Sequence, residues 1–164
     1  MSKLFFDRNI KRNYLALVWG DLENNEGRIE GHIGRHKKNR KVMDVYIDGS
    51  NGKHAVTNYK VLERFGYTTL IQCKLETGRT HQIRVHMNYL GHSIVGDDKY
   101  KKKYKKIKNA DETLIDTLYN LKRQFLHAKS LGFIHPKKNK EMTFDSILPK
   151  ELEKVLKMLR KTNK

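Results

Sequence analysis

The sequence predicts an α+β fold in which a mixed, mainly antiparallel sheet is flanked by helices. Short segments of alternating apolar and polar residues follow one another closely, with glycine-containing turns between several of them. Helical spacing of apolar residues is clearest in one short segment after the middle of the chain and in two segments near its end. The length of 164 residues, with no internal repeat and no linker, indicates one domain.

Strands are predicted wherever apolar side chains recur at every second position. The segment Asn13–Trp19 is largely apolar on both faces, which is typical of a central strand. A turn is expected at Gly49–Gly52, and Phe65–Gly66 is expected to close a hairpin. The remaining strands are expected at Arg28–Ile33, Val42–Ile47, His54–Leu62, Thr68–Leu75, Leu126–Phe133 and Met142–Phe144.

Helices are predicted by apolar residues at intervals of three and four. Thr80 is expected to cap a short helix that buries Ile83, Met87 and Leu90 on one stripe. Two longer amphipathic helices are expected at Asp111–Gln124, with Asp111 as its cap, and after Pro149.

The charge balance predicts a polyanionic partner. The chain has 35 Lys and Arg against 18 Asp and Glu, a formal charge of +17, which favours nucleic acid over a merely solubilising surface. We find no basic amphipathic helix with Trp or Phe on its apolar face, so a membrane surface is not the predicted partner.

Two basic stretches are the candidate phosphate contacts. Arg35, Lys37 and Lys38 belong to the loop RHKKNRK, which either contacts phosphates or is simply solvated. The run Lys99–Lys108, which contains Tyr100, is either an RNA-contacting loop or a disordered cationic insertion.

Cysteine and histidine usage indicates neither disulfide nor metal chemistry. Cys73 is the only cysteine and lies in an apolar strand pattern, so it is predicted to be a core residue. His81 and His86 are five residues apart, which places them off one helix face, and no zinc site is predicted. With no signal peptide and no long apolar run, the expected compartment is the cytoplasm.

The stretch Lys74–Tyr100 carries the most specific motif. It contains TGRTHQIRVHMNYLGHSIVGDDKY, which resembles the signature segment of the RluA-type RNA pseudouridine synthases, although Ser93 stands where that family usually has proline. The segment Lys101–Leu121 fits less well. The resemblance continues at Lys11–Gly20, Ile33–Met43, Gly52–Gly66 and Leu126–Pro136.

The resemblance implies part of the pseudouridine synthase catalytic fold and isomerisation of uridine to pseudouridine in ribosomal or transfer RNA, with no cofactor and no metal. It makes Tyr14 the residue that packs against the target base and assists proton removal, and Leu131 a residue lining the base pocket. It makes Arg84 the partner of the catalytic aspartate and Arg79 a structural or phosphate-facing residue. Judged by residue type alone, Tyr14 and Leu131 are ordinary core residues and each arginine is a helix-surface cation.

The family's aspartate motif, His-Arg-Leu-Asp followed by a Thr-Ser-Gly turn, is absent from the sequence. We therefore predict that residues 1–164 form one incomplete catalytic domain, a truncated synthase that is inactive alone. Its aspartate is expected to come either from upstream sequence removed from this chain or from a separately encoded N-terminal half. Arg84 is then expected to lack its carboxylate. The alternative is a non-catalytic RNA-binding module derived from that family.

Overall fold

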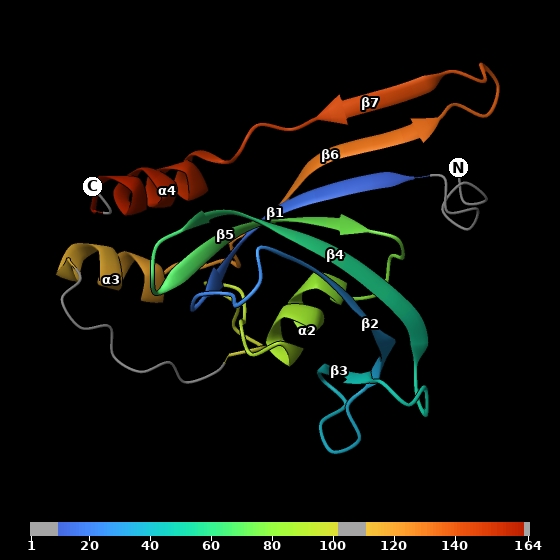
Figure 1. The fold of residues 1–164 in the computed structure, drawn as a ribbon, viewed down its shortest axis with the longest axis horizontal. Helices are drawn as coiled ribbons and strands as arrows, with labels where there is room; N and C mark the ends of the chain where they lie inside the picture. Colours follow the sequence, from blue (N-terminus) through green and yellow to red (C-terminus); the bar gives the residue numbers. More distant parts are fainter. Residues whose placement is uncertain (1–9, 102–110, 163–164) are drawn as a thin grey trace.

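The computed structural model describes residues 10–101 and 111–162, which form one seven-stranded sheet with helices on both of its faces (Figure 1). The strand order is β3-β2-β4-β5-β1-β6-β7, and every described pair is antiparallel. The α+β class predicted from the sequence is confirmed. The strands are β1 (Lys11–Trp19), β2 (Glu26–Arg35), β3 (Met43–Tyr46), β4 (Lys53–Arg64), β5 (Thr68–Leu75), β6 (Leu126–Ile134) and β7 (Glu141–Asp145).

Strand β1 is central, as its two apolar faces predicted. It pairs with β5 on one side and with β6 on the other. Ala16, Leu17 and Val18 have no exposed surface. A strand buried on both faces needs apolar side chains at successive positions, and this run supplies them.

Three helices are described: α2 (Gln82–Tyr89), α3 (Glu112–Tyr119) and α4 (Lys150–Thr162). The Asp111 cap of α3 is confirmed, because the Asp111 side chain accepts a hydrogen bond of 3.0 Å from the backbone N–H of Leu114. Helix α3 ends at Tyr119 rather than at Gln124, where it was expected to end. The predicted apolar stripe of α4 is buried at Leu152, Val155, Leu156 and Leu159.

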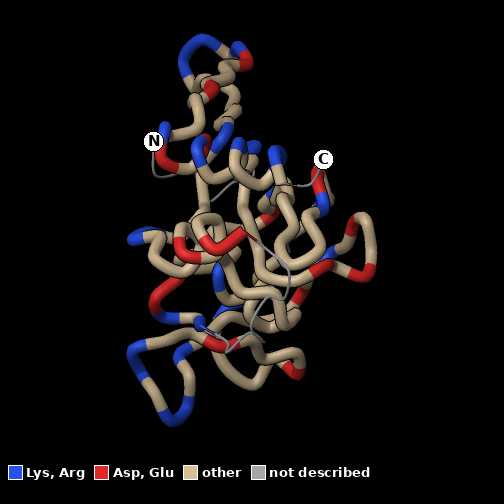
Figure 2. Tube along the Cα trace, turned by 90° about the vertical axis from the view of Figure 1, so that its left-hand side faces the viewer, with Lys and Arg blue, Asp and Glu red and all other residues tan. Residues whose placement is uncertain are grey.

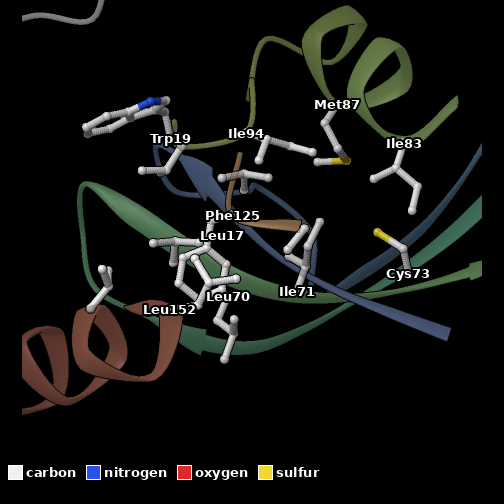
Figure 3. Packing of buried hydrophobic residues seen from close by; sticks show 14 of the residues in the cluster. Leu17, Trp19, Leu70, Ile71, Cys73, Ile83, Met87, Ile94, Phe125 and Leu152 are labelled. Atoms are coloured by element: carbon white, nitrogen blue, oxygen red, sulfur yellow. The ribbon is translucent and has the colours of Figure 1, made fainter. Parts of the chain in front are cut away.

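The core lies on both sides of the sheet (Figure 3). Ile83 and Met87 of α2 lie on the side of the sheet to which Cys73 points, and Leu152 of α4 approaches the other side near Leu70. Burial raises the pKa of the Cys73 thiol to about 12, so this cysteine is un-ionised at neutral pH. Its predicted role as a core residue is confirmed.

The start and the stripe of α2 differ from the prediction. The residue at the cap position is His81, in a left-handed conformation with φ of 56°, and it makes no side-chain cap bond. The cap predicted at Thr80 is therefore wrong. Leu90 is 37% exposed and does not complete the buried stripe, because the helix ends at Tyr89 and the chain turns away.

Most of the basic run Lys99–Lys108 falls outside the described residues. Within residues 10–101 and 111–162, no helix is both long enough and apolar enough to cross a membrane.

Two glycines with positive φ, Gly52 in the β3–β4 turn and Gly66 in the β4–β5 turn, test how tightly each turn is packed. Gly52 and Gly66 have φ of +85° and +80°, but a Cβ at Gly52 would overlap the Ile33 carbonyl, whereas a Cβ at Gly66 meets nothing. We expect Gly66→Ala to cost about 1–2 kcal/mol for the left-handed backbone alone. Gly52→Ala should cost more, because backbone must move. Urea denaturation of both variants measures this; equal costs would contradict the packing at Gly52.

Candidate functional site

Helix α2 is fixed to the sheet by a buried glutamine. The side-chain amide of Gln82 donates to the carbonyl of Val56 at 2.9 Å and to the hydroxyl of Thr57 at 3.0 Å. Its oxygen accepts from the Thr77 hydroxyl at 2.7 Å and from the Arg79 backbone N–H at 3.0 Å. Gln82 thus accepts a hydrogen bond from the backbone N–H of Arg79, just before the helix, and joins α2 to β4. The sequence pattern did not indicate this role.

Arg84 is buried and already has a carboxylate. Its Nε and Nη2 donate to the two oxygens of Asp97 at 2.6 and 2.8 Å, and the Asp97 side chain is 1% exposed. The expectation that Arg84 lacks its carboxylate is wrong. The partner follows α2 by a turn, 13 residues along the chain, where no helical spacing would reveal the pairing.

Asp97 is ionised at neutral pH. Burial raises the pKa of its carboxyl. Hydrogen bonds from Arg84 and from the backbone N–H groups of Tyr100 and Lys99, together with the Arg84 charge, lower that pKa by more than burial raises it. The net pKa of Asp97 therefore lies below its ordinary value.

Tyr100 is a structural residue rather than an RNA contact. It is 4% exposed, and the Arg84 guanidinium lies 5.1 Å from its ring centroid. Its hydroxyl accepts from the backbone N–H of Met43 and lies 3.0 Å from Nδ1 of His81. Burial, with the charges of Arg84 and Lys99, lowers the pKa of His81, so the neutral ring is favoured and Nδ1 can accept the hydroxyl proton. This network connects α2 to β3.

A basic groove lies beside this network, between the β2–β3 loop and the segment that precedes α2. Its volume is about 670 Å³ and no acidic residue lines it. The loop is the Lys- and Arg-rich tip at the bottom of Figure 2. The lining residues are Ile33, Gly34, Arg35, His36, Lys37, Arg40, Met43, Asn51, Gly52, Lys53, Arg79 and Thr80.

The groove brings together three of the four cations that the sequence indicated for RNA contact. Arg35 and Lys37 come from the loop, and Arg79 reaches the groove from the motif. Lys38 is exposed on the same loop but does not line the groove. Backbone carbonyls orient both arginines. Nε of Arg79 donates a hydrogen bond of 2.8 Å to the carbonyl of His54, and Nη1 of Arg35 donates one of 2.8 Å to the carbonyl of Arg40.

Two lining cations, Arg40 and Lys53, were not among the residues that the sequence indicated. Arg40 lies within the basic string RHKKNRK, which was a usable signal. Lys53 follows the Gly49–Gly52 turn and reaches the groove only because β4 pairs with β2, with Lys53 opposite Ile33.

Tyr14 and Leu131 lie elsewhere, on the sheet. Tyr14 is half-buried on β1, opposite Cys73 and Ala128, and Leu131 is half-buried on β6, opposite Arg12. Neither lines the basic groove, and neither does Arg84.

Arg12 lies against the TGRT turn, a position that the sequence pattern did not indicate. It shares a face of β1 with Tyr14, because alternate residues of a strand point the same way. A Cβ on Gly78 would overlap the Arg12 guanidinium, so the side chain lies directly against the glycine of the TGRT turn. The next residue, Arg79, lines the basic groove, so a single turn separates the groove from this face of β1.

The described residues hold no group of three or more His, Cys, Asp and Glu side chains that would bind a metal ion. His86 is buried, and its Nδ1 lies 2.8 Å from the hydroxyl of Thr57, while His81 faces Tyr100. Burial lowers the pKa of His86 to about 4, so it is neutral at physiological pH.

An antiparallel sheet beside a groove lined by basic and not acidic residues defines an α+β protein suited to binding a polyanion such as nucleic acid. The model of the family described as RNA pseudouridylate synthase matches residues 1–89, and the chain belongs to that family.

Curated relatives agree over nearly the whole chain. An uncharacterized RNA pseudouridine synthase of Chlorobaculum parvum is 40% identical over 164 residues, covering 98% of this chain and 50% of that protein. Ribosomal large subunit pseudouridine synthase D of Zymomonas mobilis is 41% identical, covering 100% of this chain and 50% of that protein. The chain therefore spans about half the length of these relatives.

The solved structure of human RNA pseudouridylate synthase domain containing 4 has the same fold. It aligns with a TM-score of 0.75 and 22% identity over 97% of this chain and 66% of that chain.

The Arg84–Asp97 pair should make stability pH-dependent. Because the pKa of Asp97 is lowered in the folded state, the pair stabilises above the unfolded pKa of about 3.9 and loses its effect as pH falls through the folded value. We expect Asp97→Asn to lower the free energy of unfolding by about 3–5 kcal/mol at pH 7 and to flatten its fall on the acid side.

Asp98→Asn is the matched control, because Asp98 is 78% exposed and lies 3.6 Å from Arg84. Urea denaturation between pH 2.5 and pH 7 distinguishes the two variants. Equal stability of both variants at pH 7 would contradict the importance of the buried pair.

Proposed function

We propose that this chain is the substrate-binding part of an RNA pseudouridine synthase and becomes active when another segment supplies the catalytic aspartate. The observation that carries the proposal is the convergence of Arg35, Lys37 and Arg79 on one groove in a chain of this family. The groove holds RNA phosphates, which positions the strand without reading its sequence. Residues 1–164 then form one incomplete catalytic domain.

The reaction breaks the bond between the ribose and N1 of uridine, turns the base, and rejoins it through C5, which loses its proton. The target nucleotide is extruded for this, as in other enzymes that act on bases. Tyr14 packs against the extruded base and assists removal of the C5 proton, and Leu131 forms an apolar wall of the pocket. Both are half-buried, which leaves part of each side chain available.

Arg84 acts as a support of the site. Its guanidinium is occupied by Asp97, so its contribution is to hold the turn after α2 and, through Tyr100, the loop that carries the groove.

Ribosomal RNA is the proposed substrate and the cytoplasm the proposed compartment. Several relatives are named as ribosomal large subunit pseudouridine synthases, which favours ribosomal over transfer RNA.

The second candidate is a non-catalytic RNA-binding module, and one observation favours it. Because Asp97 neutralises Arg84, the fold does not depend on an aspartate from elsewhere for this buried cation. An independent module would therefore contain no unpaired charge at Arg84, and a measurement of activity must decide between the two candidates.

Tritium release from C5-labelled uridine in ribosomal RNA is the deciding experiment. We expect none from this chain alone, and release after addition of the unmatched half of the Zymomonas mobilis relative. RNA binding with no release under either condition would establish the binding module, and release by this chain alone would overturn the need for a second segment.

The groove makes a separate prediction about salt. Removing one cation that neutralises a phosphate should reduce the slope of log affinity against log salt by about 0.7 for single-stranded RNA. Lys37→Gln and Lys53→Gln, both in the groove, should each do so. Lys154→Gln, on exposed α4 surface, should not. Fluorescence anisotropy at several salt concentrations measures the slopes; three equal slopes would contradict the groove's role.

A further inference from the structure

The β2–β3 loop is closed by a histidine ring. His36 is the first residue after β2, and its Nδ1 accepts hydrogen bonds from the backbone N–H groups of Lys38 at 3.1 Å and Asn39 at 3.0 Å. The backbone N–H of His36 donates to the carbonyl of Val42 at 3.1 Å, across the neck of the loop. One residue therefore bonds both the middle and the far end of the loop.

Asp44 favours the form of the ring that these bonds need. Its Oδ2 lies 3.9 Å from Nε2 of His36. A carboxylate beside one ring nitrogen favours the hydrogen on that nitrogen, which leaves the other nitrogen as an acceptor. A ring protonated on both nitrogens would have no acceptor for the N–H groups of Lys38 and Asn39. His36 therefore acts in this loop as a neutral acceptor and not as a cation.

The loop needs such closure because its own charges repel one another. Residues 35–41, RHKKNRK, contain five cations and no acidic residue. Like charges separated by less than a Debye length of about 8 Å repel each other at physiological salt. Two further contacts oppose this repulsion: Arg35 bonds the carbonyl of Arg40, and Nζ of Lys37 lies 5.8 Å from the ring centroid of Tyr46. A loop that is ordered before RNA arrives avoids an entropic cost of binding.

The same arrangement recurs at the tip of the β6–β7 hairpin. His135 is the first residue after β6, and its Nδ1 accepts from the backbone N–H groups of Lys137 at 3.2 Å and Lys138 at 3.3 Å. The sequences are similar, HKKN from His36 and HPKKN from His135. The two loops lie at the bottom and the top of Figure 2. A histidine that bonds two following N–H groups is thus a recurrent way in which this chain shapes a lysine-bearing loop.

We infer that His36 is a positioning residue for RNA binding, whose ring, as a hydrogen-bond acceptor, holds Lys37 and Arg40 where the groove receives RNA phosphates. Both cations line the groove, as does His36 itself. This inference rests on the proposed function, because it says how the loop side of that groove is ordered. It differs from the simpler role for a histidine near phosphates, in which the ring contributes a positive charge.

Three substitutions at position 36 separate the acceptor from a charge. His36→Asn keeps a neutral acceptor, because an asparagine side chain bonds nearby backbone N–H groups in turns. His36→Lys adds a cation but has no acceptor, and His36→Leu has neither. Fluorescence anisotropy with single-stranded RNA at several salt concentrations measures the affinity of each variant and its dependence on salt.

We expect His36→Asn to bind within about twofold of the unsubstituted chain, as for surface substitutions that keep the local bonds. His36→Leu and His36→Lys should bind about tenfold more weakly, because two hydrogen bonds that order the loop are lost. His36→Lys should also reduce the slope of log affinity against log salt by about 0.7, although it adds a charge, because a displaced cation no longer neutralises its phosphate. A loss of stability alone would not change this slope.

His32→Leu is the matched control, because it removes a histidine of β2 whose ring packs against that of His54 and does not line the groove. It should bind within about twofold of the unsubstituted chain. Amide hydrogen exchange without RNA tests the bonds directly. The amides of Lys38 and Asn39 should exchange slowly in the unsubstituted chain and in His36→Asn, and faster in the Leu and Lys variants. Melting temperatures establish that each variant is folded.

Tight binding by His36→Lys would show that His36 serves as a cation, and equal weakening by His36→Asn and His36→Leu would show that the ring itself contacts RNA. Either result would overturn the inference, as would unchanged amide exchange in His36→Leu. Unchanged binding by all three variants, while Lys37→Gln still reduces the salt slope, would reject the inference and keep the groove. A salt slope that Lys37→Gln leaves unchanged would reject the groove's proposed function, so the two failures are distinguishable.

Discussion

The buried ion pair between Arg84 and Asp97 is the interaction on which the site's architecture depends. Asp97 receives two bonds from the guanidinium and two from the backbone that follows it, which closes the turn leading to Tyr100. Tyr100 in turn accepts the N–H of Met43, at the start of β3. The pair therefore determines where the β2–β3 loop stands relative to α2. A polar network of this kind specifies one arrangement because every member is satisfied.

Two surfaces with different chemistry meet at the TGRT turn. On one side, Arg79 faces the basic groove, where cations from β2, β4 and the intervening loop gather without any acid. On the other side, Gly78 allows Arg12 to lie against the turn, and Tyr14 follows along β1. A Cβ at this position would require the guanidinium to move. One turn thus joins the basic groove with the face of β1 that holds Tyr14.

The basic groove and the face of β1 and β6 differ in whether their polar groups already have partners. The groove is formed entirely by described residues of this chain, and its arginines are already oriented by backbone carbonyls. The face of β1 and β6 retains a buried Arg12 Nε without a partner among the described residues and an exposed Phe144. The proposed binding of RNA and the proposed catalytic centre therefore depend on different parts of the molecule.

Local patterns in the sequence determined the strands, the central position of β1, the Asp111 cap and the buried stripe of α4, because periodicity and capping depend on near neighbours. The signature motif also determined the family. Only the tertiary structure decided that Arg84 binds Asp97, that Tyr100 is buried in a basic run, that Lys53 joins the groove, and that Arg12 Nε lacks an acceptor among the described residues. These outcomes depend on strand pairing and on turns that bring distant residues together. Burial of a polar group is set by everything that packs around it, which no local spacing encodes.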